Sequence, residues 1–168
     1  MTERFFPDNF PAPDEYLLEL GRITALWGSL ESSIDLAISK LSGFGESSNW
    51  RFHVLIAHSN FKQRVDILET LCHGLQDDHP HLKKYKQTIK LIIQVQSKRN
   101  YYLHNGVFLN EENGKVYTSN LSARGKLKTD IKEVSVKDLR TVSENIHLTL
   151  LSIHELITQV KYNPVWER

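Results

Sequence analysis

The fold is predicted most directly by residues 80–106, which read PHLKKYKQTIKLIIQVQSKRNYYLHNG. Their apolar side chains recur every three or four positions, which is typical of an amphipathic helix. Pro80 suits the first position of that helix, and Asn105-Gly106 predicts its end, with the glycine in a left-handed conformation. The apolar line reaches Arg99, so a guanidinium occupies a position where a core residue is expected. Such a conflict between pattern and residue type is typical of functional sites.

Further helices are predicted from the same spacing on both sides of this stretch. A short helical piece follows Gly43 to Asn49, and its apolar side is expected to hold Trp50, Val54 and Ala57. The longer helices begin at residues that resemble N-caps or capping boxes. They cover Asp14 to about Ser42, Phe61 to about Gly74 after Asn60 and Gln63, and the segment from Ser135 and Asp138 to Asn163-Pro164.

Residues 107–134 differ from the helical parts. Two short runs of β-forming residues flank Asn113-Gly114, which predicts a hairpin because this pair suits turns with positive φ. Residues 1–13 form a proline-containing arm. Its side chains Phe5, Phe6 and Phe10 are expected to pack against the body of the domain. We therefore expect one all-α domain over residues 1–168, an up-and-down bundle of four to five helices with a small β-hairpin inserted before the last helix.

The composition is that of an ordinary soluble globular protein, with 40% hydrophobic and 24% charged residues and a net charge of +1. Bulk charge therefore does not indicate a nucleic-acid binder, and any RNA contact must come from a local patch. No apolar run is long enough to span a membrane, and residues 1–13 lack a signal-peptide pattern. The single Cys72 excludes an internal disulfide and is expected to be buried. A cytoplasmic protein is expected.

Arg99 and His104 are the residues that point to chemistry. Five steps of about 100° along an ideal helix place them about 140° apart, so they converge only if the last turn opens or a second copy of the chain faces them. Histidine accepts a proton near neutral pH and arginine holds a phosphate, a combination that suits RNA cleavage. Alternatively, Arg99 pairs with a carboxylate and His104 favours the helix end through the helix dipole.

Arg99-Asn100-x-x-x-His104 at the end of a long helix resembles the R-x(4–6)-H motif of the HEPN (higher eukaryotes and prokaryotes nucleotide-binding) superfamily. Trp27-Gly28-Ser29-Leu30-Glu31 is similar to a W-x-x-L-E pattern of related prokaryotic helical proteins. The resemblance covers the helical part of the chain broadly. Many members of the superfamily are metal-independent ribonucleases, and others keep the fold only for binding or dimerisation.

The resemblance implies a role for each motif residue. Arg99 would contact the scissile phosphate, His104 would assist attack by the ribose 2′-hydroxyl, and Asn100 would orient the site. Glu31 would hold Arg99 or be structural. Members silenced by adenylylation have a tyrosine two positions after the histidine, where this chain has Gly106, so that form of control is in doubt here.

RNA-binding residues are expected beside the motif and in the inserted segment, because cations contact phosphates and aromatic rings stack on bases. A merely solvated hairpin is the alternative for the inserted residues. No metal and no cofactor are expected, since the histidines near Asp77 lack zinc-type spacing and glycine-rich phosphate loops are missing. The candidates are Lys98, Tyr102, Arg124, Lys126 and Lys128.

The sequence thus favours a homodimeric, metal-independent endoribonuclease, a toxin or phage-defence effector with RNA as its substrate. An antitoxin or other regulatory protein is a possible partner, and no membrane association is expected. The alternative is a non-catalytic HEPN-like module that binds RNA or protein. A helical scaffold without any role in nucleic-acid binding is the third hypothesis.

Overall fold

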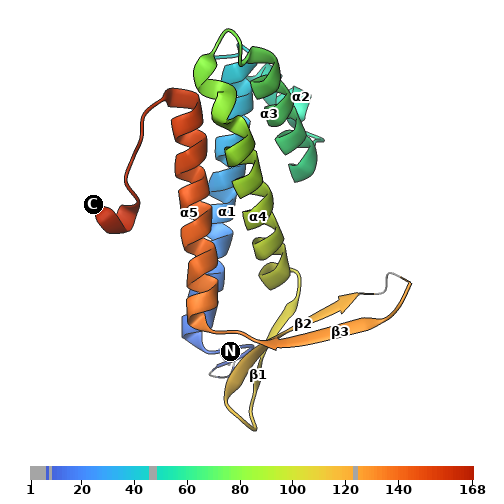
Figure 1. The fold of residues 1–168 in the computed structure, drawn as a ribbon. Helices are drawn as coiled ribbons and strands as arrows, with labels where there is room; N and C mark the ends of the chain where they lie inside the picture. Colours follow the sequence, from blue (N-terminus) through green and yellow to red (C-terminus); the bar gives the residue numbers. More distant parts are fainter. Residues whose placement is uncertain (1–6, 8, 46–48, 123–124) are drawn as a thin grey trace, which may run out of the picture. The chain divides into compact units, whose positions relative to one another are not determined.

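The computed structural model describes residue 7 and residues 9–45, 49–122 and 125–168. Within these residues the chain is mainly α-helical, and a small three-stranded antiparallel sheet precedes the last helix (Figure 1). The α-helices are α1 (Asp14–Leu41), α2 (Trp50–Ile56), α3 (Phe61–Leu75), α4 (Tyr85–Leu103) and α5 (Val136–Thr158). Two 3₁₀ helices, η1 (Pro80–Lys84) and η2 (Val165–Glu167), and the strands β1 (Gly106–Asn110), β2 (Lys115–Ser122) and β3 (Lys128–Glu133) complete the described elements.

The chain divides into two compact units, to both of which α1, α4 and α5 contribute. The first unit takes residues up to Ala25 together with Gln96–Glu144, and it contains the sheet and the end of α4. The second takes Leu26–Val95 together with Asn145–Arg168, and it contains α2 and α3. The sequence pattern did not indicate this subdivision. No helix in the described part of the chain is both long enough and apolar enough to cross a membrane.

The predicted helix starts are confirmed where side chains cap the backbone. The Asn60 side chain accepts from the backbone N–H of Gln63, whose own side chain accepts from the N–H of Asn60. At α5, Ser135 Oγ accepts from the N–H of Asp138 at 3.1 Å, and the Asp138 carboxylate accepts from the N–H of Ser135 at 3.0 Å. Each capping box satisfies donors that the first helical turn leaves unpaired.

The helical spacing of apolar residues is also confirmed by burial, which covers Ile23, Leu30 and Ile34 of α1 and Val65, Leu68 and Cys72 of α3. In the second unit, Trp27 of α1 lies 4.6 Å from the Phe61 ring of α3, measured between ring centroids. Arg64 Nη1 of α3 donates to the Asp35 carboxylate of α1 at 2.8 Å. Cys72 is buried, as expected, and burial raises the pKa of its thiol to about 11.

The apolar side predicted for the short helix α2 was wrong. In α2, Phe52 and Ile56 are buried, whereas Trp50 and Val54 are 68% and 63% exposed. Both faces of this short helix are apolar, so the spacing alone did not distinguish them. The helix start predicted at Pro80 is confirmed, although the first turn is the 3₁₀ helix η1 and the segment becomes α-helical at Tyr85.

Docking of the N-terminal arm by its phenylalanines stays a prediction, since Phe5 and Phe6 lie outside the described residues and Phe10 is 57% exposed. The backbone also holds the arm, because the Pro11 carbonyl accepts from the N–H of Leu109 in β1 at 3.1 Å. Ala12, directly after this bond, is fully buried.

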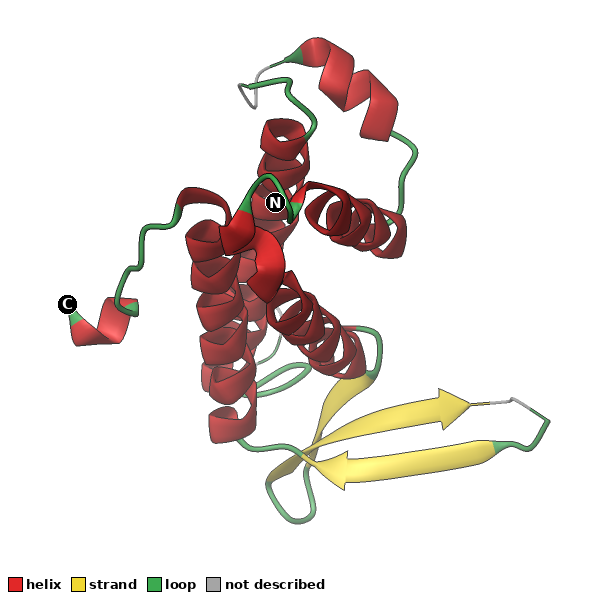
Figure 2. Ribbon diagram, turned by 45° about the horizontal axis from the view of Figure 1, so that its top comes forward, coloured by secondary structure: helices red, strands yellow, loops and turns green. Residues whose placement is uncertain are grey.

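The predicted hairpin is present as β1 and β2, with Gly114 in the left-handed conformation at φ +67°. A third strand was not expected within residues 107–134: β3 adds to the hairpin by pairing with β2. β1 pairs with the first part of β2 and β3 with its later part, so β2 and β3 extend together as a ribbon (Figure 2). One face of the sheet carries the buried residues Val116, Thr118 and Val134.

Candidate functional site

The candidate site lies at the junction of α4 and β1, in the first unit. α4 ends at Leu103, and the backbone N–H of His104 still donates to the Asn100 carbonyl at 3.1 Å. His104 is thus the first residue beyond the helix, and its ring reaches back until Nε2 is 3.0 Å from Arg99 Nη1. The same Nη1 donates to Asn100 Oδ1 at 3.1 Å. The three motif residues are therefore in contact within one chain.

The Arg99–His104 contact defines the state of the imidazole. A guanidinium carries donors and no acceptor, so Nε2 of His104 must be the acceptor in this bond. An imidazole that accepts a hydrogen bond at Nε2 carries its proton on Nδ1. His104 is exposed to solvent while Arg99 and Asn100 are half-buried. Nε2 of the exposed His104 is thus held in place by the half-buried Arg99 guanidinium.

The predicted helix cap at Asn105-Gly106 was wrong. Gly106 does not adopt a left-handed conformation; it begins β1 and lies opposite Ser119 of β2. The Asn105 side chain donates to the Tyr101 carbonyl at 2.6 Å and so satisfies one of the last carbonyls of α4. The chain therefore passes from the motif directly into the sheet.

Aromatic and basic side chains adjoin the motif. The rings of Tyr101 and Tyr102 meet edge to face at 5.1 Å, and Lys132 Nζ of β3 lies 5.8 Å from the centroid of the Tyr101 ring. Tyr102, a predicted RNA-binding residue, is half-buried, and burial followed by the charge of Asp138 raises the pKa of its hydroxyl. Lys98, on the last turns of α4, is exposed.

Two of the predicted basic residues of the insertion, Lys126 and Lys128, are at the far end of the β2–β3 ribbon. Lys126 and Lys128 are exposed, whereas Arg124 lies outside the described residues. Gly106, Ser119 and Ile131 are in line across the three strands. Lys128 is three residues along β3 from that line, roughly 10 Å at the usual rise per residue. The insertion thus carries two exposed lysines, Lys126 and Lys128, away from His104.

Salt bridges reduce the positive charge of the sheet. Lys132 pairs with Asp130 at 2.9 Å and Lys115 pairs with Glu133 at 2.7 Å. The hydrogen bonds to these carboxylates raise the pKa of both ammonium groups. Lys126 and Lys128 have no such ion pair among the described residues. They are therefore the cations of β3 and its preceding turn that remain available to an anionic partner.

Glu31 belongs to the second unit, where it is half-buried on α1. Its predicted role in holding Arg99 stays a prediction. Among the described residues, no group of three or more histidine, cysteine, aspartate or glutamate side chains is close enough to hold a metal ion.

Two features of the first unit were missed in the sequence. Glu19 of α1 is buried and accepts from Arg22 Nη1 at 2.6 Å and from Arg140 Nε of α5 at 3.1 Å. An acidic residue within an apolar helix face was the available signal. Tyr117 is one of the aromatic residues that were expected to stack on bases, but its partner Phe108 was missed. The two rings stack across β1 and β2 with centroids 6.1 Å apart, and the period-two position of Phe108 in its strand was the available signal.

Comparisons of this chain with models of known protein families, with curated proteins and with solved structures found no match.

Proposed function

We propose that this chain is a HEPN-like, metal-independent endoribonuclease that acts as a toxin or phage-defence effector in the cytoplasm. The observation that supports this most directly is the 3.0 Å contact between Arg99 Nη1 and His104 Nε2, with Asn100 bonded to the same guanidinium. A neutral imidazole accepts a proton and a guanidinium holds a phosphate, and these are the two groups that 2′-hydroxyl attack requires. The helical part is proposed to be the up-and-down bundle of that superfamily.

In the proposed reaction, the scissile phosphate attracts the Arg99 guanidinium and releases His104 Nε2 from it. Nε2 then takes the proton of the ribose 2′-hydroxyl while the 2′-oxygen forms a bond to phosphorus. The bond from phosphorus to the 5′-oxygen breaks, and that oxygen takes a proton from solvent or from an imidazolium. The products are a 2′,3′-cyclic phosphate and a 5′-hydroxyl, and Arg99 stabilises the charge that develops on the phosphoryl oxygens.

The exposed position of His104 also supports a homodimer, because two copies of this helix end would provide two arginines and two histidines around one RNA strand. In that arrangement the histidine of one copy acts as base and that of the other as acid. Lys98, Tyr102, Lys126 and Lys128, with Arg124, are proposed to contact the RNA. An antitoxin or another regulatory protein would cover this surface.

A non-catalytic RNA- or protein-binding module is the second candidate. The observation that favours it is the stacked pair of Phe108 and Tyr117 on a sheet whose other face is buried. Phe108 is 38% exposed, and exposed aromatic rings on a sheet bind bases without cleaving the strand. In that case the contact between Arg99 and His104 would be structural.

The deciding experiment is cleavage of a defined single-stranded RNA by the purified chain in excess EDTA, compared with the His104→Ala and Arg99→Ala variants. We expect a cyclic-phosphate product from the native chain and none from either variant, with unchanged circular dichroism and melting. His58→Ala is the matched control, since His58 is an exposed histidine of the second unit. RNA binding without cleavage in all four proteins would support the binding module instead.

A further inference from the structure

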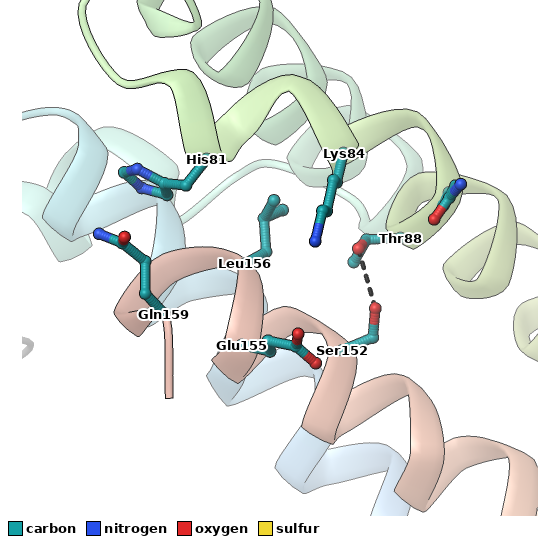
Figure 3. Close-up of a pocket in the computed structure, with 8 residues that line it drawn as sticks. His81, Lys84, Thr88, Ser152, Glu155, Leu156 and Gln159 are labelled. Atoms are coloured by element: carbon teal, nitrogen blue, oxygen red, sulfur yellow. Dashed lines mark hydrogen bonds between the residues drawn. The ribbon is translucent and has the colours of Figure 1, made fainter. Parts of the chain in front are cut away.

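A polar pocket of about 420 Å³ lies within the second unit, between the start of the η1–α4 segment and the end of α5 (Figure 3). Small-molecule sites in proteins have volumes of roughly 300–1,000 Å³. One wall carries His81, Lys84 and Gln87, and the other carries Glu155 and Gln159. The RNase motif belongs to the other unit, so the proposed ribonuclease chemistry does not account for this pocket.

The lining of the pocket contains two hydroxyl groups that are hydrogen-bonded to each other. The hydroxyls of Thr88 and Ser152 are 2.9 Å apart and join α4 to α5 (Figure 3). Other helical threonines in this chain, namely Thr24, Thr70, Thr141, Thr149 and Thr158, donate to the carbonyl four residues earlier. Thr88 turns away from that bond although it is only 3% exposed.

The orientation of the Thr88 hydroxyl leaves one hydroxyl proton of the Thr88–Ser152 pair available to a ligand. Two hydroxyls have two protons, and their mutual bond uses one of them. The second proton, on either Thr88 or Ser152, has no acceptor among the described residues. Thr88 is almost buried and Ser152 is half-buried at the edge of the pocket, so an acceptor atom of a ligand in the pocket could take this proton.

Gln159 provides an independent sign of a site. It follows α5 in the left-handed conformation at φ +63°, and its N–H donates to the Glu155 carbonyl at 2.9 Å. Glycine adopts this conformation at a helix end at lower cost than glutamine does. The side chain that makes the position costly is one that lines the pocket. Local strain at a concave polar surface is the pattern that binding sites show.

The charges of the pocket identify the class of ligand. Lys84 and Glu155 project from opposite walls (Figure 3), and neither takes part in an ion pair among the described residues. We propose that the pocket binds a small zwitterion of the α-amino-acid class, with its carboxylate at Lys84 and the free hydroxyl proton and its ammonium at Glu155. The Gln87 and Gln159 amides then contact the body of the ligand.

Other small ligands fit these charges less well. A free phosphate would gain from Lys84 but would be repelled by Glu155, and a simple amine would meet the reverse conflict. A purely apolar ligand would leave both charges and the hydroxyl pair without partners. A zwitterion satisfies the cation, the anion and the donor together. Charge-assisted hydrogen bonds of this kind are about twice as strong as neutral ones.

The test is titration of the ¹⁵N-labelled full chain with each of the twenty standard L-amino acids at about 1 mM, where a site with a Kd near 1 mM is half filled. We expect at least one of them to shift the amide signals of Thr88, Ser152 and Gln159. Lys84→Met and Glu155→Gln should each weaken that binding by about tenfold or more. The matched controls, Lys83→Met and Glu144→Gln, remove exposed charges of the same elements outside the pocket lining.

Derivatives of the amino acid that binds test whether its ammonium and its carboxylate are both required. Its N-acetyl form lacks the ammonium and its amide form lacks the carboxylate, and we expect each to lose about tenfold or more in affinity. Equal binding of either derivative, stronger binding of inorganic phosphate, or no signal shift with any of the twenty amino acids would each overturn the proposal. None of these outcomes bears on RNA cleavage, which is measured separately.

Discussion

The Arg99 guanidinium and the His104 imidazole are 3.0 Å apart, and the histidine is the first residue beyond α4. The histidine is thereby held by its neighbour on the preceding turn. The His104 imidazole and an incoming phosphate oxygen compete for the same N–H donors of the Arg99 guanidinium. A bound phosphate therefore displaces the imidazole. Substrate binding and release of the base are therefore the same event in the proposed reaction.

This relationship predicts that Arg99→Lys will not rescue cleavage. Lysine keeps the charge but lacks the planar fork that holds a phosphate with two parallel bonds. We expect the cleavage rate to fall by about 10²-fold or more, which is typical when one stabilising donor is removed from an active site. Single-turnover cleavage measures the rate. A variant with native activity would show that only the charge of Arg99 matters.

Because the Glu19 carboxylate is buried, removing its two arginine partners is predicted to cost more stability than removing the carboxylate itself. Arg22→Met with Arg140→Met leaves that carboxylate uncompensated, and we expect a loss of about 2 kcal/mol or more in the free energy of unfolding. Glu19→Leu should cost less, because both arginines are about half exposed and turn to water. Urea denaturation of the three proteins measures the difference. An equal loss of unfolding free energy in the double arginine variant and in Glu19→Leu would mean that Glu19 acts through packing.

The C-terminal segment is predicted to detach from His147 at acidic pH. The N–H of Val165 donates to His147 Nε2 at 3.2 Å, and the ring meets Trp166 at 5.2 Å. Burial, followed by the charge of Arg168, lowers the pKa of His147 below its usual 6.5. The bond is therefore fully present above about pH 6.5 and is lost as pH falls through the lower folded-state pKa, since a protonated ring accepts nothing.

The indole N–H signal of Trp166, followed by NMR from neutral to acidic pH, measures this release. The exposed Trp50 provides the internal control, and its signal should stay constant over the same range. His147→Ala should show the released signal at every pH. A Trp166 signal that is independent of pH in the native chain would contradict the prediction.

The start of α5 is predicted to lose stability in acid, whereas the start of α3 is not. The hydroxyl and the backbone N–H of Ser135 lower the pKa of Asp138 below its usual 3.8. The contribution of this box is therefore present above about pH 4 and is lost as pH falls through the folded-state pKa. Ser135→Ala should cost about 1 kcal/mol at neutral pH.

Asn60→Ala is the matched substitution at α3, because neither Asn60 nor Gln63 titrates. Its cost should be about the same, near 1 kcal/mol, at neutral and acidic pH. Thermal unfolding of both variants and the native chain at several pH values gives the comparison. A loss that depends on pH in Asn60→Ala would show that other carboxylates dominate.

Cys72 is predicted to be unreactive in the folded chain. Its side chain is fully buried, and burial, with a smaller effect of Glu69, raises the pKa of the thiol to about 11. The thiolate is the reactive form, so alkylation at pH 7 to 8 should proceed only in denaturant. Mass spectrometry of iodoacetamide-treated protein, native and urea-unfolded, measures this. Rapid labelling of the native chain would show local opening around α3.

Local sequence determined the helices because their signals lie within a few residues of one another. Asn60 and Gln63 specify the start of α3, and the three- and four-residue spacing specifies its buried face. The same logic fails in α2, where seven residues offer two apolar faces and only packing selects Phe52 over Trp50. β3 carries four charged residues in six and is a strand only because β2 pairs with it.

For the sites, the sequence by itself determined which residue types stand near one another along the chain, and so it indicated Arg99, Asn100 and His104. Whether Arg99 and His104 meet depends on where α4 ends, and the pairing of Gly106 with Ser119 starts a strand directly after that end. The pocket depends wholly on tertiary structure, because Thr88 and Ser152 are 64 residues apart. Such contacts arise from the packing of whole helices, and no periodicity within either helix encodes them.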